Sequence, residues 1–166
     1  MEGFVRDWRF SDLEEPWKDP SRFVPLEAER FEAILASAAS SRLLHSSGPY
    51  IDFAERFRPR IKDRAGYAVR TITSERERRV KILVGSDDAL RVWLNGEIVL
   101  QVLVLRSAIP DTEEADLRLV AGANTLVVEV SNGESNWGLF FRFVDEEGRR
   151  LRLTGEGRLE VVEVPE

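Results

Sequence analysis

Two aspartates stand side by side at Asp87 and Asp88, directly after Gly85 and Ser86. Carboxylate oxygens are hard ligands, and oxygen ligands on converging loops are what Ca²⁺ binds in proteins. An adjacent pair supplies only part of such a cage, so a second segment has to complete it. The alternative interpretation is structural: Asp87 braces its own loop through the backbone, while Asp88 is solvated.

Other carboxylates cluster at Glu75/Glu77, Glu113-Glu114 and Asp145–Glu147. Glycoside hydrolysis needs two carboxyl groups about 5–10 Å apart across a cleft. These clusters fall in turns with exposed neighbours, and nothing distinguishes a catalytic pair among them. We therefore expect no enzyme, and a glycan-acting enzyme is the least favoured of three functional interpretations.

Four aromatic side chains are candidates for stacking on a sugar, because an aromatic ring offers a flat apolar platform with a polar tip. They are Trp8, Trp17, Tyr50 and Trp137. Trp137 is the best candidate, since it follows the loop-like sequence Gly133–Asn136 and lies beside a predicted strand. Packing in the core is the alternative for each of these rings.

The composition argues against several classes of site. The 166 residues include no cysteine and one histidine, His45, so a zinc site or a catalytic triad would need unusual members, and we assign His45 no role. A net charge of -6 argues against a nucleic-acid partner, which requires basic surface. Acidic residues and Pro59 interrupt the basic run Arg56–Arg64, which favours a solvated face over a site for an anionic polymer.

The overall composition is that of one soluble globular domain spanning residues 1–166, with 43% hydrophobic and 33% charged residues. No apolar run approaches the roughly 20 residues that span a bilayer. The segment Met1–Asp7 lacks the basic and apolar regions of a signal peptide. The compartment stays open, with an extracellular location expected if a leader was removed.

Strand patterns dominate the chain from Tyr50 onward. Asn95-Gly96 predicts a two-residue type I′ turn, with Gly96 at positive φ, between strands at 90–94 and 97–105. Trp93 is expected on the face opposite Leu90, because side chains alternate along a strand. Further strands are predicted at 65–73, 79–84, 116–120, 125–130, 137–144, 149–153 and 158–164. Short strands at this spacing predict an all-β fold, an antiparallel β-sandwich, over residues 49–166.

The N-terminal part, residues 1–48, has a different organisation. Phe4–Phe10 reads as a strand with Trp8 and Phe10 on one face, and prolines and charges in 11–25 indicate a loop. Apolar residues recur at helical spacing over 26–38, so a short helix is predicted there.

The most specific segment is Gly85–Val99, which contains the aspartate pair and the run Val-Trp-Leu-Asn-Gly-Glu. It resembles the signature of galactose-binding-like and PA14-like jelly rolls, as do Val120–Asn132 and the aromatic strand Asn136–Phe143. That group includes the sugar-binding jelly roll that precedes the catalytic barrel of β-galactosidases and β-glucuronidases. The resemblance covers residues 50–144 and implies a jelly-roll fold. It departs from the pattern at Ala89, where a glycine usually follows the aspartates.

The same resemblance implies a site and a function. In calcium-dependent PA14-like lectins an aspartate pair at this place binds Ca²⁺ with an asparagine from another loop and sugar hydroxyls. This implies Asp87 and Asp88 as metal ligands, Asn132 or Asn136 as a further oxygen ligand, and Trp137 beside them against a glycan. We therefore expect a non-catalytic carbohydrate-binding accessory module, with calcium as cofactor, in or beside a larger bacterial protein. The alternative is a structural or protein-interaction jelly roll without sugar affinity.

Overall fold

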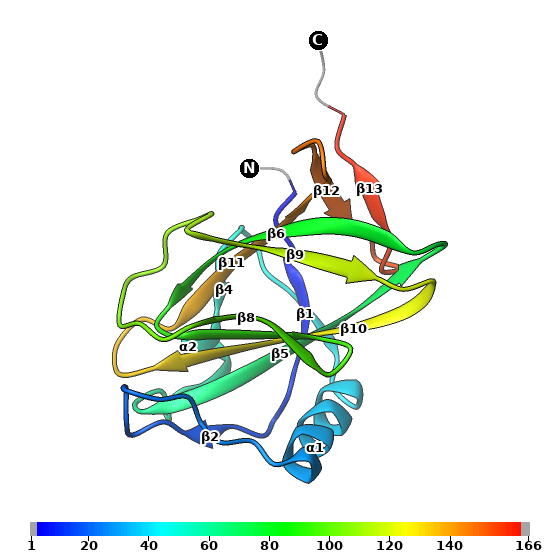
Figure 1. Cartoon of the computed structure of the whole chain (residues 1–166). Helices are drawn as coiled ribbons and strands as arrows, with labels where there is room; N and C mark the ends of the chain where they lie inside the picture. Colours follow the sequence, from blue (N-terminus) through cyan, green and yellow to red (C-terminus); the bar gives the residue numbers. More distant parts are fainter. Residues whose placement is uncertain (1–2, 164–166) are drawn as a thin grey trace.

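The computed structural model describes residues 3–163, which form two packed antiparallel sheets and two helices (Figure 1). The seven-stranded sheet has the order β3 (Leu43–His45), β1 (Asp7–Phe10), β5 (Arg64–Ser74), β10 (Gly122–Asn132), β7 (Leu90–Leu94), β8 (Glu97–Val102), with β2 (Glu15–Pro16) also paired to β5. The six-stranded sheet has the order β13 (Leu159–Val161), β12 (Arg150–Leu153), β11 (Gly138–Val144), β6 (Arg78–Asp87), β9 (Glu113–Leu119), with β4 (Ile51–Asp52) also paired to β11. The predicted all-β sandwich is confirmed.

The core lies between the two sheets and follows the alternation of side chains along each strand. Leu126, Val128 and Val130 of β10 point into this core, whereas Val127 and Glu129 point to the opposite face of the sheet. Phe and Val side chains of β11 and β6 fill the core from the other sheet. Period-two hydrophobicity therefore decides which face of each strand is buried.

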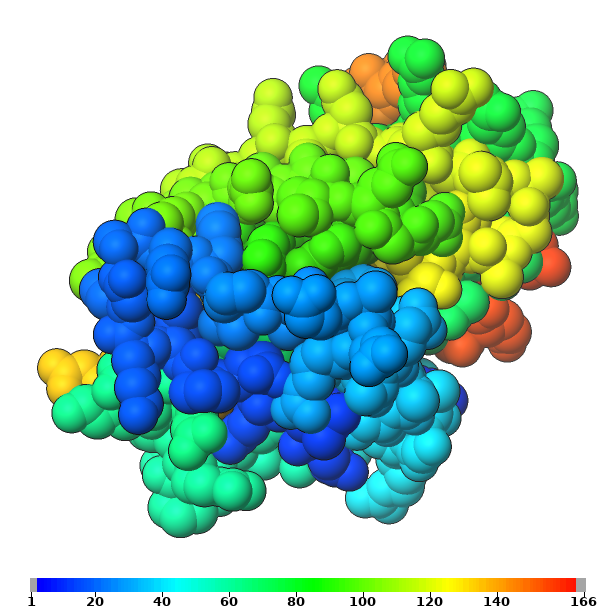
Figure 2. Space-filling view, turned by 60° about the horizontal axis from the view of Figure 1, so that its bottom comes forward, coloured from blue at the N-terminus to red at the C-terminus, as the bar shows by residue number. Residues whose placement is uncertain are grey.

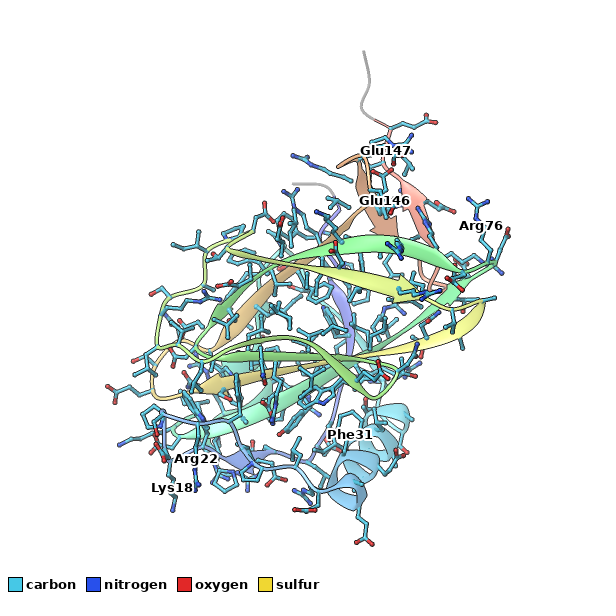
Figure 3. The ribbon with its side chains drawn as sticks, in the orientation of Figure 1. Lys18, Arg22, Phe31, Arg76, Glu146 and Glu147 are labelled. Atoms are coloured by element: carbon cyan, nitrogen blue, oxygen red, sulfur yellow. The ribbon has the colours of Figure 1, made fainter. Side chains whose placement is uncertain are left out.

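Helix α1 (Ala28–Ala39) covers the outer face of the seven-stranded sheet. Ile34 packs there with Trp93, and the ring of Phe31 lies 5.3 Å from that of Trp93, between helix and sheet (Figure 3). The space-filling view shows the N-terminal quarter of the chain, in blue, spread across this face (Figure 2). The predicted helix at 26–38 and the predicted position of Trp93, opposite Leu90, are confirmed.

A buried ion pair also joins the N-terminal segment to this face. Arg91 donates two hydrogen bonds to the Glu129 carboxylate, at 2.9 and 2.8 Å, and a third to the carbonyl of Val24. The Tyr67 hydroxyl donates to the same carboxylate at 2.6 Å, and the Arg91 guanidinium lies 5.0 Å from the centre of the Phe23 ring. Each charge is therefore partnered, as burial requires.

The predicted hairpin turn is confirmed. Asn95 and Gly96 both have positive φ, 51° and 82°. The Asn95 side chain donates to the Oδ1 atom of Asn124, and the Asn124 amide in turn donates to the carbonyls of Val120 and Gly122. Two asparagines thus tie the β7–β8 turn to the start of β10.

Several predicted boundaries differ from the structure; the first strand, for example, begins at Asp7 rather than at Phe4. The strand expected at 97–105 ends at Val102, because its partner β7 begins at Leu90, which is paired with Val102. The basic run Arg56–Arg64 begins inside a short helix that the sequence did not predict, α2 (Phe53–Phe57), whose first turn is capped by the Asp52 side chain accepting from the Glu55 amide. Residue 164 of the last predicted strand lies outside the described residues. No helix within residues 3–163 is long and apolar enough to cross a membrane.

Candidate functional site

The aspartate pair lies at a corner where the chain passes from one sheet to the other. Asp87 ends β6 in the six-stranded sheet, and β7 in the seven-stranded sheet starts at Leu90, so Asp88 and Ala89 form the crossing. The peptide bond between Asp87 and Asp88 is cis, and the Asp88 amide donates to the carbonyl of Ser131 at 2.8 Å. This corner is at the left in Figure 1, where β6 and β10 end.

Asp88 holds two neighbouring loops through their backbone. Its Oδ1 accepts the amide of Arg106 at 2.8 Å, and its Oδ2 accepts the amide of Gly133 at 2.9 Å. The side chain is 8% exposed. The structural alternative had Asp87 bracing its loop and Asp88 solvated. This assignment is wrong, because it is Asp88 that is buried and accepts the backbone amides.

Asn132 ends β10 beside these contacts and is fully buried. Its Nδ2 donates to the carbonyl of Ile61 at 2.6 Å, whereas its Oδ1 has no donor among residues 3–163. A buried acceptor without a partner is uncommon and marks a place where an ion or water can bind. The two residues that flank Asn132 in the chain, Ser131 and Gly133, both contact Asp88 through their backbone.

Asp87 is held in an environment that disfavours its negative charge. Burial, the charge of Asp88 and a hydrogen bond with that carboxyl group raise the pKa of Asp87 to about 7. Two adjacent carboxylates repel each other unless a proton or a cation lies between them. At neutral pH a proton or a cation bound between the two carboxylates would therefore relieve their repulsion.

Tyr50 lies on the same side of the corner as Asp87. Burial, and then the charges of Asp52 and Asp87, raise the pKa of Tyr50 to about 12. Its hydroxyl therefore stays protonated throughout the physiological range.

Asp88 opens onto a cavity of about 340 Å³. The lining combines apolar surface with charged groups, contributed by Trp17, Pro20, Lys62, Asp63, Leu105, Gly133 and Glu134. A hollow of this size accommodates a small polar ligand. Lys18 and Arg22 point outward from the loop that carries Trp17 and Pro20 (Figure 3).

Arg106 is a site residue that sequence reasoning missed. Besides its amide contact to Asp88, its guanidinium donates to the carbonyl of Ser86 at 3.0 Å and pairs with Glu113 at 2.6 Å. It thereby fixes the loop between β8 and β9 against the aspartate corner. The sequence carried no signal for this role, because Arg106 lies 18 residues from Asp88 in a segment without regular structure.

The predicted stacking role of Trp137 is wrong, because the ring is completely buried. It stacks on Phe57 at 5.1 Å, packs on Phe53 at 5.7 Å, and its Nε1 donates to the carbonyl of Val130. The short helix α2, which the sequence did not reveal, supplies both phenylalanines. Gly66 leaves space for the indole, since a Cβ there would lie 2.8 Å from it.

The remaining predicted positions divide into buried and exposed groups. Trp8 and Trp17 are buried, with 0% and 3% exposure, so neither presents a free ring face. Asn136 is exposed on the loop before β11, and its role as an oxygen ligand stays a prediction. Tyr50 is the partly exposed member of the four aromatic candidates.

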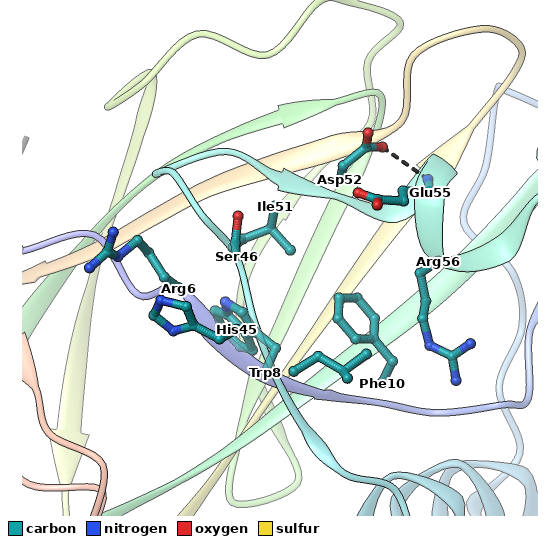
Figure 4. A pocket seen from close by; sticks show the side chains of 10 residues that line it. Arg6, Trp8, Phe10, His45, Ser46, Ile51, Asp52, Glu55 and Arg56 are labelled. Carbon is teal, nitrogen blue, oxygen red and sulfur yellow. Dashed lines mark hydrogen bonds between the residues drawn. The ribbon is translucent and has the colours of Figure 1, made fainter.

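A second cleft of about 360 Å³ opens where β1 and β3 face β4 and α2 (Figure 4). Phe10 and Ile51 form its floor, and Asp52, Glu55 and Arg56 lie along one end. Asp52 caps α2 there, and Arg56 pairs with Asp12 at 2.7 Å. Asp52 and Arg56 thus have structural partners.

The residues at the corner fit a calcium ion in their chemistry. Among residues 3–163 no three Asp, Glu or His side chains converge on one point, so carboxylates alone do not form a cage. Asp87 and Asp88 offer carboxylate oxygens, and Asn132 offers an unused amide oxygen. Each carboxylate oxygen accepts more than one contact, so the backbone amides on Asp88 leave capacity for a cation.

No family model and no curated protein sequence matches the chain. An anti-sigma factor domain-containing protein of known structure is 12% identical, with a TM-score of 0.53 over 76% of this chain and 44% of that one. A glycosyl hydrolase family 2 member from Bacteroides cellulosilyticus is 12% identical, with a TM-score of 0.50 over 86% of this chain and 20% of that one. A PA14 sugar-binding domain from an RTX adhesin aligns over 96% of this chain and 73% of its own, at 12% identity and a TM-score of 0.46.

What these proteins share with the chain is the fold. The expected resemblance to galactose-binding-like and PA14-like jelly rolls is confirmed at that level. The chain spans less than half the length of the anti-sigma factor protein and a fifth of the hydrolase.

Proposed function

We propose that this chain is a carbohydrate-binding module whose glycan site lies at the Asp87–Asp88 corner and uses calcium. The observation that carries the proposal is the buried aspartate pair beside Asn132, whose buried Oδ1 has no donor among the described residues. The cavity in front of Asp88 gives a ligand access to the Asp88 side of this corner.

Asp87, Asp88 and Asn132 would hold the ion through their side-chain oxygens, a donor set of the hard type that Ca²⁺ takes. When bound, calcium supplies positive charge and open coordination positions for sugar hydroxyls. The chain's own contribution is rigidity. Backbone amides of Arg106 and Gly133 fix the Asp88 carboxylate, so the loops around the site are positioned before any ligand arrives.

A non-catalytic role is favoured by the structural contacts of three other carboxylates. Glu113 pairs with Arg106, and Asp145 accepts the amides of Glu147 and Arg149 in its own turn. Glu129 is buried in the ion pair with Arg91. A glycosidase needs two carboxyl groups free to act on the same bond, and these groups are engaged in structural contacts.

An interaction module is the second candidate, and the loop between β8 and β9 is the observation that favours it. Leu103, Leu105 and Ile109 of this loop are 40%, 60% and 64% exposed. Exposed apolar groups close together mark a surface for protein contacts. Leu105 also lines the Asp88 cavity, so the same side chain suits the apolar face of a sugar ring.

Calcium titration by calorimetry tests the proposal on the chelator-treated protein. Wild type should bind one Ca²⁺ per chain. Asp87→Asn keeps the shape of the side chain and removes its charge, and should weaken the affinity at least roughly tenfold, since a charged contact is worth more than a neutral one. Asp116→Asn, at an aspartate whose side chain is 84% exposed, should bind as wild type does. Absence of calcium binding to wild type would overturn the calcium part of the proposal.

A further inference from the structure

The ring of Tyr50 occupies the place of a missing side chain at Gly138. A Cβ on Gly138 would lie 2.1 Å from both Cζ and Oη of Tyr50, so only glycine lets the ring settle on the sheet at this point. Phe140, two residues along β11 on the same face, supports the ring from the side at a centroid distance of 5.3 Å. Tyr50 is thus fixed against the outer face of the six-stranded sheet.

This position sets the ring beside the aspartate corner. Gly138 is paired with Asp87 on β6 and with Asp52 on β4. Residues directly opposite one another in an antiparallel pair point to the same face, with Cβ atoms about 5 Å apart. Because the Tyr50 ring fills the side-chain position of Gly138, it lies in one row with the carboxylates of Asp52 and Asp87.

The next row of the same face is shaped by the loop between β8 and β9. A Cβ on Gly85 would lie 1.7 Å from the carbonyl oxygen of Ile109, so this loop runs directly over Gly85. Gly85 is paired with Phe140. The exposed side chain of Ile109 therefore belongs to the surface that also carries the Tyr50 ring.

We propose that Tyr50 is the stacking platform of the glycan site and that the preferred ligand is a neutral hexopyranoside. The apolar face of the sugar ring would lie on Tyr50, and its hydroxyls would reach the Asp87 side of the corner. The proposed calcium offsets the charge of Asp87, whereas Asp52, the other acidic neighbour of the ring in its row, would repel a uronic acid. This inference rests on the proposed function and assigns to Tyr50 the role that buried Trp137 cannot fill.

The two tyrosines of the chain make a direct test feasible. Protein labelled with 3-fluorotyrosine gives one ¹⁹F resonance from Tyr50 and one from Tyr67, which is fully buried and serves as internal reference. The probes are methyl α-mannopyranoside, methyl β-galactopyranoside, methyl β-glucopyranoside and glucuronic acid, each titrated in the presence of calcium. A neutral glycoside should shift the Tyr50 resonance saturably and leave Tyr67 in place, and glucuronic acid should bind more weakly.

Two variants separate stacking from other roles. Tyr50→Phe keeps the ring and should retain glycoside affinity within a few-fold. Tyr50→Leu should lose roughly tenfold or more of it, while its calcium affinity and melting temperature stay near wild type. Saturable glycoside binding with an unmoved Tyr50 resonance and full affinity of Tyr50→Leu would overturn the inference and leave the proposed function standing. Loss of calcium affinity in Tyr50→Leu would also overturn it, by showing a structural role. If no probe binds wild type, the proposed function fails and the inference with it.

Discussion

Asp87 and Asp88 are neighbours in the chain, yet they act differently in the structure. Asp88 is fixed by two backbone amides and joins the loops that carry Arg106 and Gly133. Asp87 faces Tyr50 and a carboxylate neighbour, and burial leaves its charge poorly compensated. Asp88 therefore stabilises the corner, and Asp87 supplies a carboxylate that a bound cation would stabilise.

The stability of the calcium-free protein should depend on the charge of Asp87. Its folded-state pKa of about 7 lies above the ordinary value of 3.8, so the folded state holds a proton that the unfolded state releases between these values. The free energy of unfolding should therefore fall as the pH rises from about 4 to 7 and level off above it. In Asp87→Asn this loss should be absent, making the variant more stable than wild type at pH 8 by on the order of 1 kcal/mol.

Urea denaturation with a chelator present, at pH 5 and at pH 8, checks this prediction. Exposed Asp116→Asn is the matched control and should follow wild type at both values. An unfolding free energy that changes equally with pH in wild type and Asp87→Asn would show that Asp87 is not the responsible group. Calcium added at pH 8 should raise the free energy of unfolding of wild type by an amount that grows with the logarithm of the calcium concentration divided by its Kd.

At the scale of elements, the β7–β8 hairpin fixes the register that brings the start of β7 to the corner. Leu90 of β7 is paired with Val102 of β8 and with Val130 of β10. The turn at Asn95-Gly96 closes the other end of the same strand. Register errors in the turn would shift Leu90, and with it the crossing that contains Asp88.

Gly96→Val should destabilise the protein through backbone strain. Gly96 has a φ of 82°, and no atom lies within 4 Å of the position its Cβ would take, so steric contact with neighbours contributes nothing. The left-handed conformation costs an L-residue about 1–2 kcal/mol. Gly48→Val is the matched control, because Gly48 also has open space around it but no positive φ. Thermal denaturation should separate the two variants, and equal melting temperatures would contradict the assigned turn.

At the scale of the whole molecule, the features that the sequence predicts correctly are those that depend on residues close together in the chain. The period-two pattern of β10 and the Asn95-Gly96 turn depend on neighbouring residues only, and both are confirmed. The burial of Trp137 depends on Phe53 and Phe57, which lie 84 and 80 positions away on a five-residue helix that is too short for a periodic signal. Loop contacts such as Arg106 with Asp88 likewise arise from tertiary packing.

The same distinction explains which aromatic ring faces solvent. Trp137 stands in a loop-like sequence and nevertheless belongs to the core, whereas Tyr50 comes to the surface beside Asp87 because Gly138 leaves room for its ring. The pairing of β4 and β6 with the same residue of β11 brings Tyr50 and Asp87 together. Neither segment contains a sequence pattern that predicts that Tyr50 and Asp87 lie side by side.

The most direct test of the central claim is a glycan array probed with the wild-type chain and with Asp87→Asn, in calcium and again in chelator. Calcium-dependent binding at the Asp87–Asp88 corner predicts a restricted set of neutral glycans bound by wild type in calcium only. Asp87→Asn should lose most of this signal, and Asp116→Asn should keep it. Wild-type binding that survives the chelator, or equal binding by Asp87→Asn, would contradict the claim. Absence of any glycan signal from folded wild type would favour the second candidate function, a protein-interaction module.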